Sequence, residues 1–370
     1  MEANQVYTLV NSAVAQGLGR TDLTAIDSAS LVSVGNVVLS SQTNTDAFLN
    51  TLVQRIGRTI ISYRRYTSKL GDMVLTDFEW GAILQKLKVR MPEATIEEDV
   101  ALVDGQSVDH YKVAKPSVGQ KLFVGRSPFK LFVTIQRVWL KEAFLSDSAM
   151  AAFIGAIYGE VQNKIELSFE QLGRAALGYG VSQTAGTARE IKLVTLYNAG
   201  VATADQVTAQ TALRSPDFLR WAIGELQLYP EYFTDMSTLY NDGTETRHTP
   251  REDQRMRILT AFDTALRTQV QYSAYNKEML ELGAYTKLNY WQAAETPMSV
   301  LVAGVNSEDV RVDNIVAILH DRDAVGCYKQ EEDVLTTPVN AFGSYYNTVY
   351  HVRREYMFDT SENFVVFTLN

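Results

Sequence analysis

The residues best suited to chemistry in this sequence are His320, Asp321, Arg322 and Asp323, which follow one another directly. An imidazole and two carboxylates this close together could bind a metal ion or exchange protons with a substrate. The same residues could form a polar turn, because residues 314–319 before them have the apolar pattern of a buried strand. We favour the turn, and we therefore expect no catalytic, cofactor-binding or metal-binding residues in this protein.

Other enzyme motifs are incomplete. The remaining histidines, His110, His248 and His351, lack the spacing of a motif such as H-E-x-x-H. The stretch 178–180, Gly-Tyr-Gly, is similar to a phosphate-binding loop, but the third glycine is missing and a predicted helix precedes it instead of a strand. We interpret these glycines as the end of that helix. The sequence contains neither a Walker loop nor a G-x-S-x-G elbow.

One basic cluster could contact nucleic acid; it consists of Arg247, Arg251, Arg255 and Arg257, with His248 among them. Acidic residues are interspersed with these arginines, namely Glu245, Glu252 and Asp253. We therefore favour a solvated face or one that contacts another subunit. The net charge of −9 and the pI of about 5.1 also argue against a free-standing protein that binds duplex DNA, which normally presents a basic face.

The composition describes a well-folded protein. A length of 370 residues corresponds to two or three domain-sized units, and 46% hydrophobic residues can bury sizeable cores. The single cysteine, Cys327, excludes an internal disulfide framework and a cysteine-based zinc site. The N-terminus lacks the pattern of a signal peptide, and no stretch approaches the roughly 20 apolar residues of a membrane span. We expect the protein to be made and used in the cytoplasm, without a membrane.

The first half of the chain changes its periodicity twice. Residues 1–45 are small and polar, which predicts an extended arm without a core of its own. A short helix is predicted over 46–62, with Thr45 or Asp46 as its cap and an apolar stripe that includes Phe48 and Leu52. Over 63–140 the period becomes two, and basic and acidic residues fall in separate stretches. This predicts a long β-rich extension in which Leu87 and its alternating apolar neighbours form one face and lysines the other.

The strongest helix pattern begins at Ser146, a good N-cap, and runs over 146–178. A helix of that length spans about 50 Å. A second helical region is predicted over about 203–228, where Ser215 and Pro216 can start a new helix. Residues 249–253 could open another helix or form a turn before a strand at 256–260. The sequence closes with a predicted pair of strands, 344–358 and 364–367, whose tyrosines Tyr346, Tyr350 and Tyr356 we expect inside a buried sheet rather than at an interface.

In the order of these elements the chain resembles the major capsid proteins of tailed bacteriophages, most nearly those of small short-tailed phages of the type that infect Bacillus. The segments that carry the resemblance are 44–57, 144–158 with the long helix after it, 312–323 and 344–352. The resemblance implies an α+β chain with the capsid fold that these phages share with the floor of the herpesvirus shell. It also favours a strand at 256–260.

The resemblance implies a division of the chain into regions. These are an N-terminal arm (1–45), a short helix (46–62), an extended β loop (63–140), a peripheral domain (141–229 and 326–370) with its spine helix at 146–178, and an axial domain (230–325). The extended loop would reach over a neighbouring subunit. Its charged residues would then meet complementary charges there; the candidates are Lys86, Lys88, Arg90, Glu93, Glu97, Glu98 and Asp99. The alternative is a solvated loop whose charges serve solubility.

The function implied is that of a structural, non-enzymatic head subunit. Pentamers and hexamers of it would form an icosahedral shell around double-stranded DNA, contacted non-specifically, with portal, scaffolding and accessory capsid proteins as partners. Such a protein is assembled in the host cytoplasm and resides in the virion. Two alternatives are an encapsulin-like compartment that encloses a cargo enzyme and a cytoplasmic enzyme that uses residues 320–323. We further expect the arm and the extended loop to be ordered only by neighbouring subunits.

Overall fold

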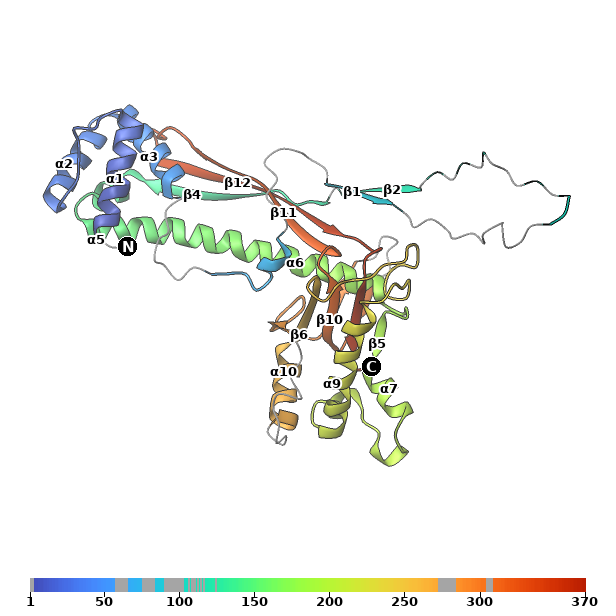
Figure 1. The fold of residues 1–370 in the computed structure, drawn as a ribbon. Helices are drawn as coiled ribbons and strands as arrows, with labels where there is room; N and C mark the ends of the chain where they lie inside the picture. Colours follow the sequence, from blue (N-terminus) through green and yellow to red (C-terminus); the bar gives the residue numbers. More distant parts are fainter. Residues whose placement is uncertain are drawn as a thin grey trace.

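The computed structural model describes residues 3–56, 66–74, 84–89, 103–105, 107, 111, 113, 115, 117–123, 125–271, 284–303 and 309–370. Two hydrophobic cores, one near each end of a long helix, organise these residues (Figure 1). We call them the N-terminal core, which begins with the first helices, and the C-terminal core, which contains the end of the chain. In Figure 1 a thin hairpin extends from their junction, away from the N-terminal core.

Five helices build most of the N-terminal core: α1 (Ala3–Leu18), α2 (Ser28–Leu39), α3 (Gln42–Ile56), α4 (Arg137–Ala143) and α5 (Asp147–Ile154). The prediction of an extended arm over 1–45 is therefore wrong. Val6 and Val10 lie on a buried stripe of α1, and Asp27 caps α2 by accepting a hydrogen bond from the Ser30 amide. Helix α3 begins before its predicted caps, and its residues Phe48 and Leu52 are fully buried.

The predicted long helix is present, but it ends later than expected. The hydroxyl of Ser146 accepts a hydrogen bond from the Ala149 amide at 3.1 Å, as an N-cap does. Helix α5 continues through a π-helical turn (Gly155–Gly159) into α6 (Glu160–Thr184), so Gly178 and Gly180 lie inside the helix. A Cβ on Gly180 would lie 2.5 Å from the ring of Phe358. The glycine therefore permits close packing of a strand on the helix instead of ending it.

A four-stranded sheet lies along the long helix; its strands are β3 (Gly125–Arg126), β4 (Phe129–Gln136), β11 (Val325–Thr336) and β12 (Tyr345–Phe358). β12 pairs antiparallel with β11 on one side and with β3 and β4 on the other. One buried charged side chain ties the sheet to the long helix. Arg354 of β12 stacks on Phe169 of α6 and donates a hydrogen bond to the Ile165 carbonyl at 2.7 Å.

The sheet of the C-terminal core has five strands in the order β5 (Glu190–Lys192), β13 (Phe364–Thr368), β10 (Ile315–Asp321), β6 (Gln254–Leu259) and β7 (Tyr285–Leu288). β10 and β13 are buried throughout, as the strand prediction for 314–319 required, and β6 confirms the strand at 256–260. The predicted terminal strand pair is wrong, because β13 pairs with β10 and β5 and not with β12. The turn 359–363 passes the chain from one sheet to the other.

Helices cover the five-stranded sheet; they are α7 (Leu193–Ala199), α8 (Ala209–Ala212), α9 (Pro216–Tyr232) and α10 (Thr260–Leu266). Ser215 caps α9 as predicted, with Pro216 in its first turn. Phe218 of α9 shares a core with Ile258 of β6 and Phe364 of β13. The two cores thus group the elements differently from the predicted domains, which separated 141–229 and 326–370 from 230–325. Among the described residues, no helix has the length and hydrophobicity that a bilayer span requires.

Two short hairpins complete the described structure: β1 (Leu84–Val89) with β2 (Val118–Phe123), and β8 (Val300–Val302) with β9 (Val310–Val312). The β1–β2 hairpin lies in the predicted extended loop, and in Figure 1 its strands lie above the C-terminal core, on the side away from the N-terminal core. The remaining 3-10 and π turns are at Gly71–Met73, Thr203–Asp205 and Arg267–Gln271.

Candidate functional site

A cluster of lysines and carboxylates joins the base of the β1–β2 hairpin to the turn that follows β12. In the antiparallel register Lys86 of β1 lies directly opposite Lys121 of β2, and Lys88 lies opposite Gly119. Like charges opposite one another destabilise a strand pair unless an anion compensates them. The turn supplies that compensation through Asp359 and Glu362. We call these five charged residues the lysine–carboxylate cluster.

The cluster is close-set and partly buried. Nζ of Lys88 lies 2.8 Å from Oδ2 of Asp359, and Nζ of Lys121 lies 2.8 Å from Oδ1 of the same carboxylate. Nζ of Lys86 lies 2.8 Å from Oε1 of Glu362 and 3.1 Å from Asp359. Lys88 also donates a hydrogen bond to the Ser361 hydroxyl. The Asp359 side chain is completely buried, so its charge interacts with the three lysines with little screening by water.

The charges of the cluster are set by these contacts. Burial alone would raise the pKa of Asp359, but hydrogen bonds from Lys121, Lys88 and Ser361 outweigh it and hold that pKa far below its usual range. Burial likewise disfavours the charged form of Lys86, but the contacts with Glu362 and Asp359 outweigh it and raise its pKa. Both groups are therefore ionised at neutral pH. Removing one partner of such a buried pair leaves an uncompensated charge, which is strongly destabilising.

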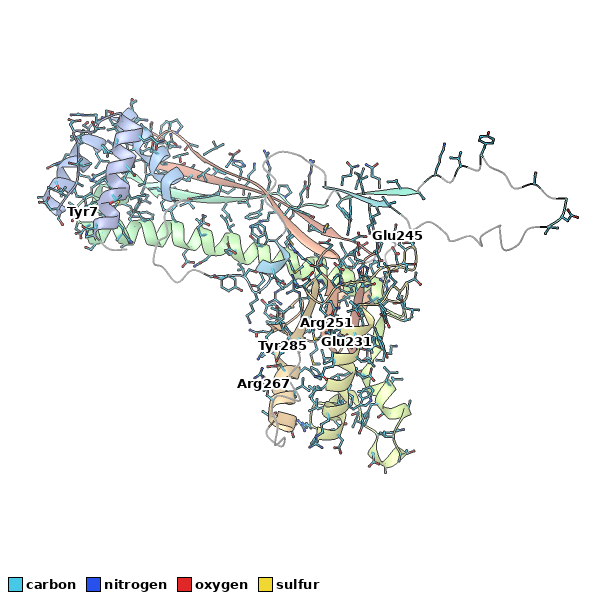
Figure 2. The ribbon with its side chains drawn as sticks, viewed as in Figure 1. Tyr7, Glu231, Glu245, Arg251, Arg267 and Tyr285 are labelled. Carbon is cyan, nitrogen blue, oxygen red and sulfur yellow. The ribbon has the colours of Figure 1, made fainter. Side chains whose placement is uncertain are left out.

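Residues 242–247 support the turn from the other side. Thr360 donates from its hydroxyl to Asp242 at 2.7 Å, and the Asp242 amide donates to the Thr360 carbonyl at 3.0 Å. Arg247 forms an ion pair with Glu245, and its Nε lies 4.0 Å from Glu362. Figure 2 shows Glu245 beside the junction where the hairpin departs. The turn is thus held in place independently of the lysines, and it can fix the direction of the hairpin.

The hairpin is inverted with respect to the usual amphipathic strand pair. Its charged face packs on its own chain, whereas its apolar face points outward. That outward face carries Leu87, Val89, Val118 and Leu122, each more than half exposed, together with Gln85 and Gln120. A two-stranded ribbon with such a face normally gains its stability by packing against another surface. The arrangement can anchor an arm and present an apolar strip; it offers no group arranged for acid–base or nucleophilic chemistry.

The structure places the predicted subunit-contact residues as follows. Lys86 and Lys88 pair with carboxylates of their own chain, and their contacts with a neighbouring subunit stay a prediction. The others lie outside the described residues, so their contacts stay a prediction; they are Arg90, Glu93, Glu97, Glu98 and Asp99. The sequence did not predict that Asp359, Glu362 and Lys121 belong to this site. The only available signal was the two acids within the polar turn 359–363, because their partners are far away in the sequence.

His320 and its neighbours serve the C-terminal core. The side chain of His320 is completely buried, and its Nε2 accepts a hydrogen bond from Nε of Arg257 at 3.1 Å. Burial and the nearby Arg257 charge lower the pKa of His320 to about 3, so the imidazole is neutral. Arg257 in turn pairs with Asp72 at 2.8 Å. Within the described part of the chain, no group of three or more His, Cys, Asp or Glu side chains is placed to hold a metal ion.

The predicted basic cluster does not form a free positive surface. Arg247 pairs with Glu245, Arg251 with Glu231, and both Arg255 and Arg257 lie near Asp72. Figure 2 shows Arg251 and Glu231 close together at the C-terminal core. These pairs neutralise the arginines, which favours the predicted solvated or subunit-contacting face over contact with nucleic acid. Of the three predicted sheet tyrosines, Tyr346 and Tyr350 are buried as expected, whereas Tyr356 is partly exposed.

Comparison with solved structures places the fold among phage capsids. The capsid structure of Staphylococcus phage Andhra is similar over 84% of this chain and 87% of that chain, with a TM-score of 0.54 at 11% identity. A structure of bacteriophage P68 and the capsid of cyanophage P-SCSP1u are more distant. Both give a TM-score of 0.49 over 84% of this chain, with 87% and 90% of those chains covered and identities of 12% and 14%. The fold assignment rests on the first.

Comparison of the sequence identifies the family as well as the fold. No curated protein sequence matches this chain significantly. One family model does match, and it covers residues 10–368, which include most of both cores, the hairpin and the lysine–carboxylate cluster. The predicted α+β capsid fold is therefore confirmed, and the chain belongs to the Phi29-like phage major capsid protein family.

Proposed function

We propose that this capsid subunit assembles with copies of itself into pentamers and hexamers of an icosahedral shell that encloses double-stranded DNA. The observation that carries the proposal is the inverted hairpin. Its apolar face is exposed, while the lysines of its other face are paired with carboxylates of the same chain. Fully burying an aliphatic side chain stabilises a contact by about 1.5–3 kcal/mol, so four of them form a useful docking strip. A neighbouring copy of the chain is the surface that we propose covers it.

The finer assignments of the function follow from the family and stay proposals. We place the protein with the small short-tailed phages of the Bacillus-infecting type, assembled in the host cytoplasm and without enzymatic activity. Portal, scaffolding and accessory capsid proteins are its proposed partners, and packaged DNA is contacted non-specifically. The encapsulin-like alternative would use the same kind of shell for a cargo protein. Analysis of purified native particles separates the two, because packaged DNA supports the first and an enclosed enzyme supports the second.

The hairpin proposal is tested with the double variant Leu87→Ser and Val89→Ser. Both side chains are exposed and touch no core, so the isolated subunit should keep its secondary structure and its unfolding temperature. Shell formation, followed by light scattering and electron microscopy, should fall strongly. The control is Leu239→Ser, an equally exposed leucine in the C-terminal core region. Shells of normal yield and normal disassembly temperature from the double variant would contradict the role of the hairpin.

The charge contacts proposed for residues 93–99 need a separate test. Exposed ion pairs contribute only about 0–1 kcal/mol each, so their effect depends on repetition over many copies. Reversing Glu97, Glu98 and Asp99 together to lysine should hinder assembly at low ionic strength while leaving the secondary structure intact. The same yield and disassembly temperature at low salt would mean that these charges serve solubility alone.

A further inference from the structure

The turn between β11 and β12, residues 337–344, has an unusual construction. It lies at the end of the long sheet that reaches the N-terminal core, beside α3 (Figure 1). The side chain of Asn340 accepts hydrogen bonds from the amides of Phe342 and Gly343 at 3.0 and 3.2 Å. Its backbone carbonyl accepts one from the Ser344 amide at 2.8 Å. A single asparagine therefore fixes the path of the whole turn.

Further contacts tie the turn to the body of the protein. The Arg137 amide at the start of α4 donates to the Ser344 carbonyl at 3.0 Å. The ring of Tyr345 lies so close over the turn that a Cβ on Gly343 would overlap it, so any other residue there would push the ring aside. Val339 packs against the N-terminal core. The backbone around Phe342 is thus well determined before anything binds to it.

Against this ordered backbone, the Phe342 side chain is fully exposed, with a relative accessibility of 105%. A phenylalanine can bury about 150–250 Å² of surface, and large aromatic side chains dominate the energetics of interfaces. When the backbone that carries such a ring is already ordered, binding costs little additional conformational entropy. Phe342 therefore has the properties of an interface anchor.

A second group of apolar side chains lies on the outer face of the sheet, separated from the turn by an outward polar row of Thr134, Asn347 and Thr337. Phe132 of β4, Val349 of β12 and Leu335 of β11 lie opposite one another in the strand register and form a row across the sheet. Phe132 and Leu335 are largely exposed. The adjacent outward row is polar and consists of Lys130, His351 and Asp333. We call Phe132, Leu335, Phe342 and Val349 the tip surface; it combines exposed apolar side chains with polar neighbours, as protein interfaces do.

The charge pattern indicates which partner fits. From Val334 to Val352 the sequence contains no Asp, Glu, Lys or Arg, although the whole chain carries a net charge of −9. Two copies of an acidic protein repel each other wherever their charged faces approach. An uncharged apolar surface lets identical chains meet without that cost, whereas a basic partner would gain nothing from it.

We propose that the tip surface, anchored by Phe342, is a contact between copies of this chain in the assembled shell, separate from the contact made by the β1–β2 hairpin. The proposal rests on the proposed function as a self-assembling shell subunit. The occupant is a second copy of the chain; binding of a different capsid component is an outcome that the experiment can reveal.

The first experiment measures whether Phe342 becomes covered. Cys327, the only native cysteine, is buried, so a Phe342→Cys variant carries one accessible thiol. Its maleimide labelling rate is measured in dissociated subunits and in shells purified from cells that express this chain alone. An Ile26→Cys variant, exposed on the N-terminal core, serves as the matched control. We expect labelling of Phe342→Cys to slow at least about tenfold on assembly, as for a buried interface anchor, with little change at position 26.

Three results would overturn the proposal. These are equal labelling of Phe342→Cys in subunits and shells, equal slowing at both positions, and protection that appears only when another capsid protein is present. Because the purified shells contain a single kind of chain, selective protection at position 342 must come from another copy.

The second experiment measures the energetic role of the anchor. Phe342→Ser should lower the yield of shells at a fixed protein concentration at least about tenfold, as truncating an interface anchor does, while Phe342→Leu restores most of it. The unfolding temperature of the isolated subunit should not change, because Phe342 is outside the cores. A wild-type chain that never associates would overturn the proposed function together with this inference. If the wild type forms shells and Phe342→Ser forms them in the same yield, only the inference about the tip surface is overturned.

Discussion

The N-terminal helices and the β1–β2 hairpin were both expected to depend on neighbouring subunits for their order, yet they are held in different ways. The helices α1–α3 bury an apolar core of their own together with α4 and α5. The hairpin base has only a small apolar cluster, in which Phe123 packs with Tyr328 and Met357. Its other contacts are the ion pairs between the buried carboxylate of Asp359 and the lysines around it. Apolar burial does not depend on protonation and is not weakened by screening, whereas ion pairs respond to both pH and salt. The two regions should therefore respond to different perturbations.

The largest effect is expected for Phe48→Ala in α3. Phe48 is fully buried and packs on Phe144 with a ring separation of 5.4 Å. Removing its ring should lower the free energy of unfolding by about 3–5 kcal/mol, as for other buried phenylalanines. In limited proteolysis the N-terminal helices should become sensitive while hydrogen exchange of the hairpin strands stays normal. Early cleavage of these helices in the wild-type subunit would break the comparison, because it would mean that they too depend on neighbours.

The second effect concerns Asp359→Asn, which removes one charge and keeps the shape of the side chain. Lys88 would then be buried with less compensation, and stability should fall by about 3 kcal/mol, the lower end for breaking a buried pair because Lys86 and Lys121 are partly exposed. Amide exchange of β1 and β2 should accelerate most. The control is Asp217→Asn, whose pair with Arg220 lies at the surface, with 78% and 51% of the two side chains accessible, and should contribute little. Unchanged exchange in the hairpin would show that its direction is set by other contacts.

Lowering the pH should destabilise the hairpin but not the N-terminal helices, without any substitution. The pKa of Asp359 is depressed in the folded state, so its contribution is present above the unfolded carboxyl pKa of about 3.9 and is lost as the pH falls below it. Between that value and the folded pKa, binding of one proton to Asp359 can lower the protection of the hairpin amides by up to about tenfold per pH unit. Exchange of the β1 and β2 amides should therefore rise below about pH 4. Parallel loss of protection in α1 and α3 at the same pH would contradict the distinction.

The smallest effect is expected from salt. Lys121 is the most exposed lysine of the cluster, with 39% of its side chain accessible, so counterions can reach it. Raising the ionic strength to about 1 M shortens the screening length to about 3 Å and should speed exchange in the hairpin a few-fold. Protection of the N-terminal helices should stay constant or increase slightly. An unresponsive hairpin would indicate that burial shields the whole cluster.

The sequence predicted the elements whose periodicity is strong. The long helix with its cap at Ser146, the α9 start at Ser215 and the buried strand before His320 are all confirmed. The helices α1 and α2 were missed because they are made of small residues, although Val6, Leu9, Val10, Ala13 and Val14 already had helical spacing.

The candidate site could not be predicted, because it depends on contacts between distant parts of the chain. Lys88 and Asp359 meet only after both sheets have formed, and neither residue has a motif around it. The turn after β12 carried the usual signals of a hairpin, but turn chemistry does not decide whether the next strand returns to the same sheet or enters another. The glycines of α6 were misread for a related reason. A glycine that ends a helix and one that admits an aromatic ring from another strand are identical in sequence.

The placement of β12 and β13 has a consequence for synthesis on the ribosome. These are the last two strands in chain order, yet each occupies an inner position: β12 between β11 and β4, and β13 between β5 and β10. Neither sheet can close, and the hairpin cannot be anchored at Asp359, until residues 345–368 have left the exit tunnel. We therefore expect a nascent chain to lack the finished subunit surface until both strands have paired.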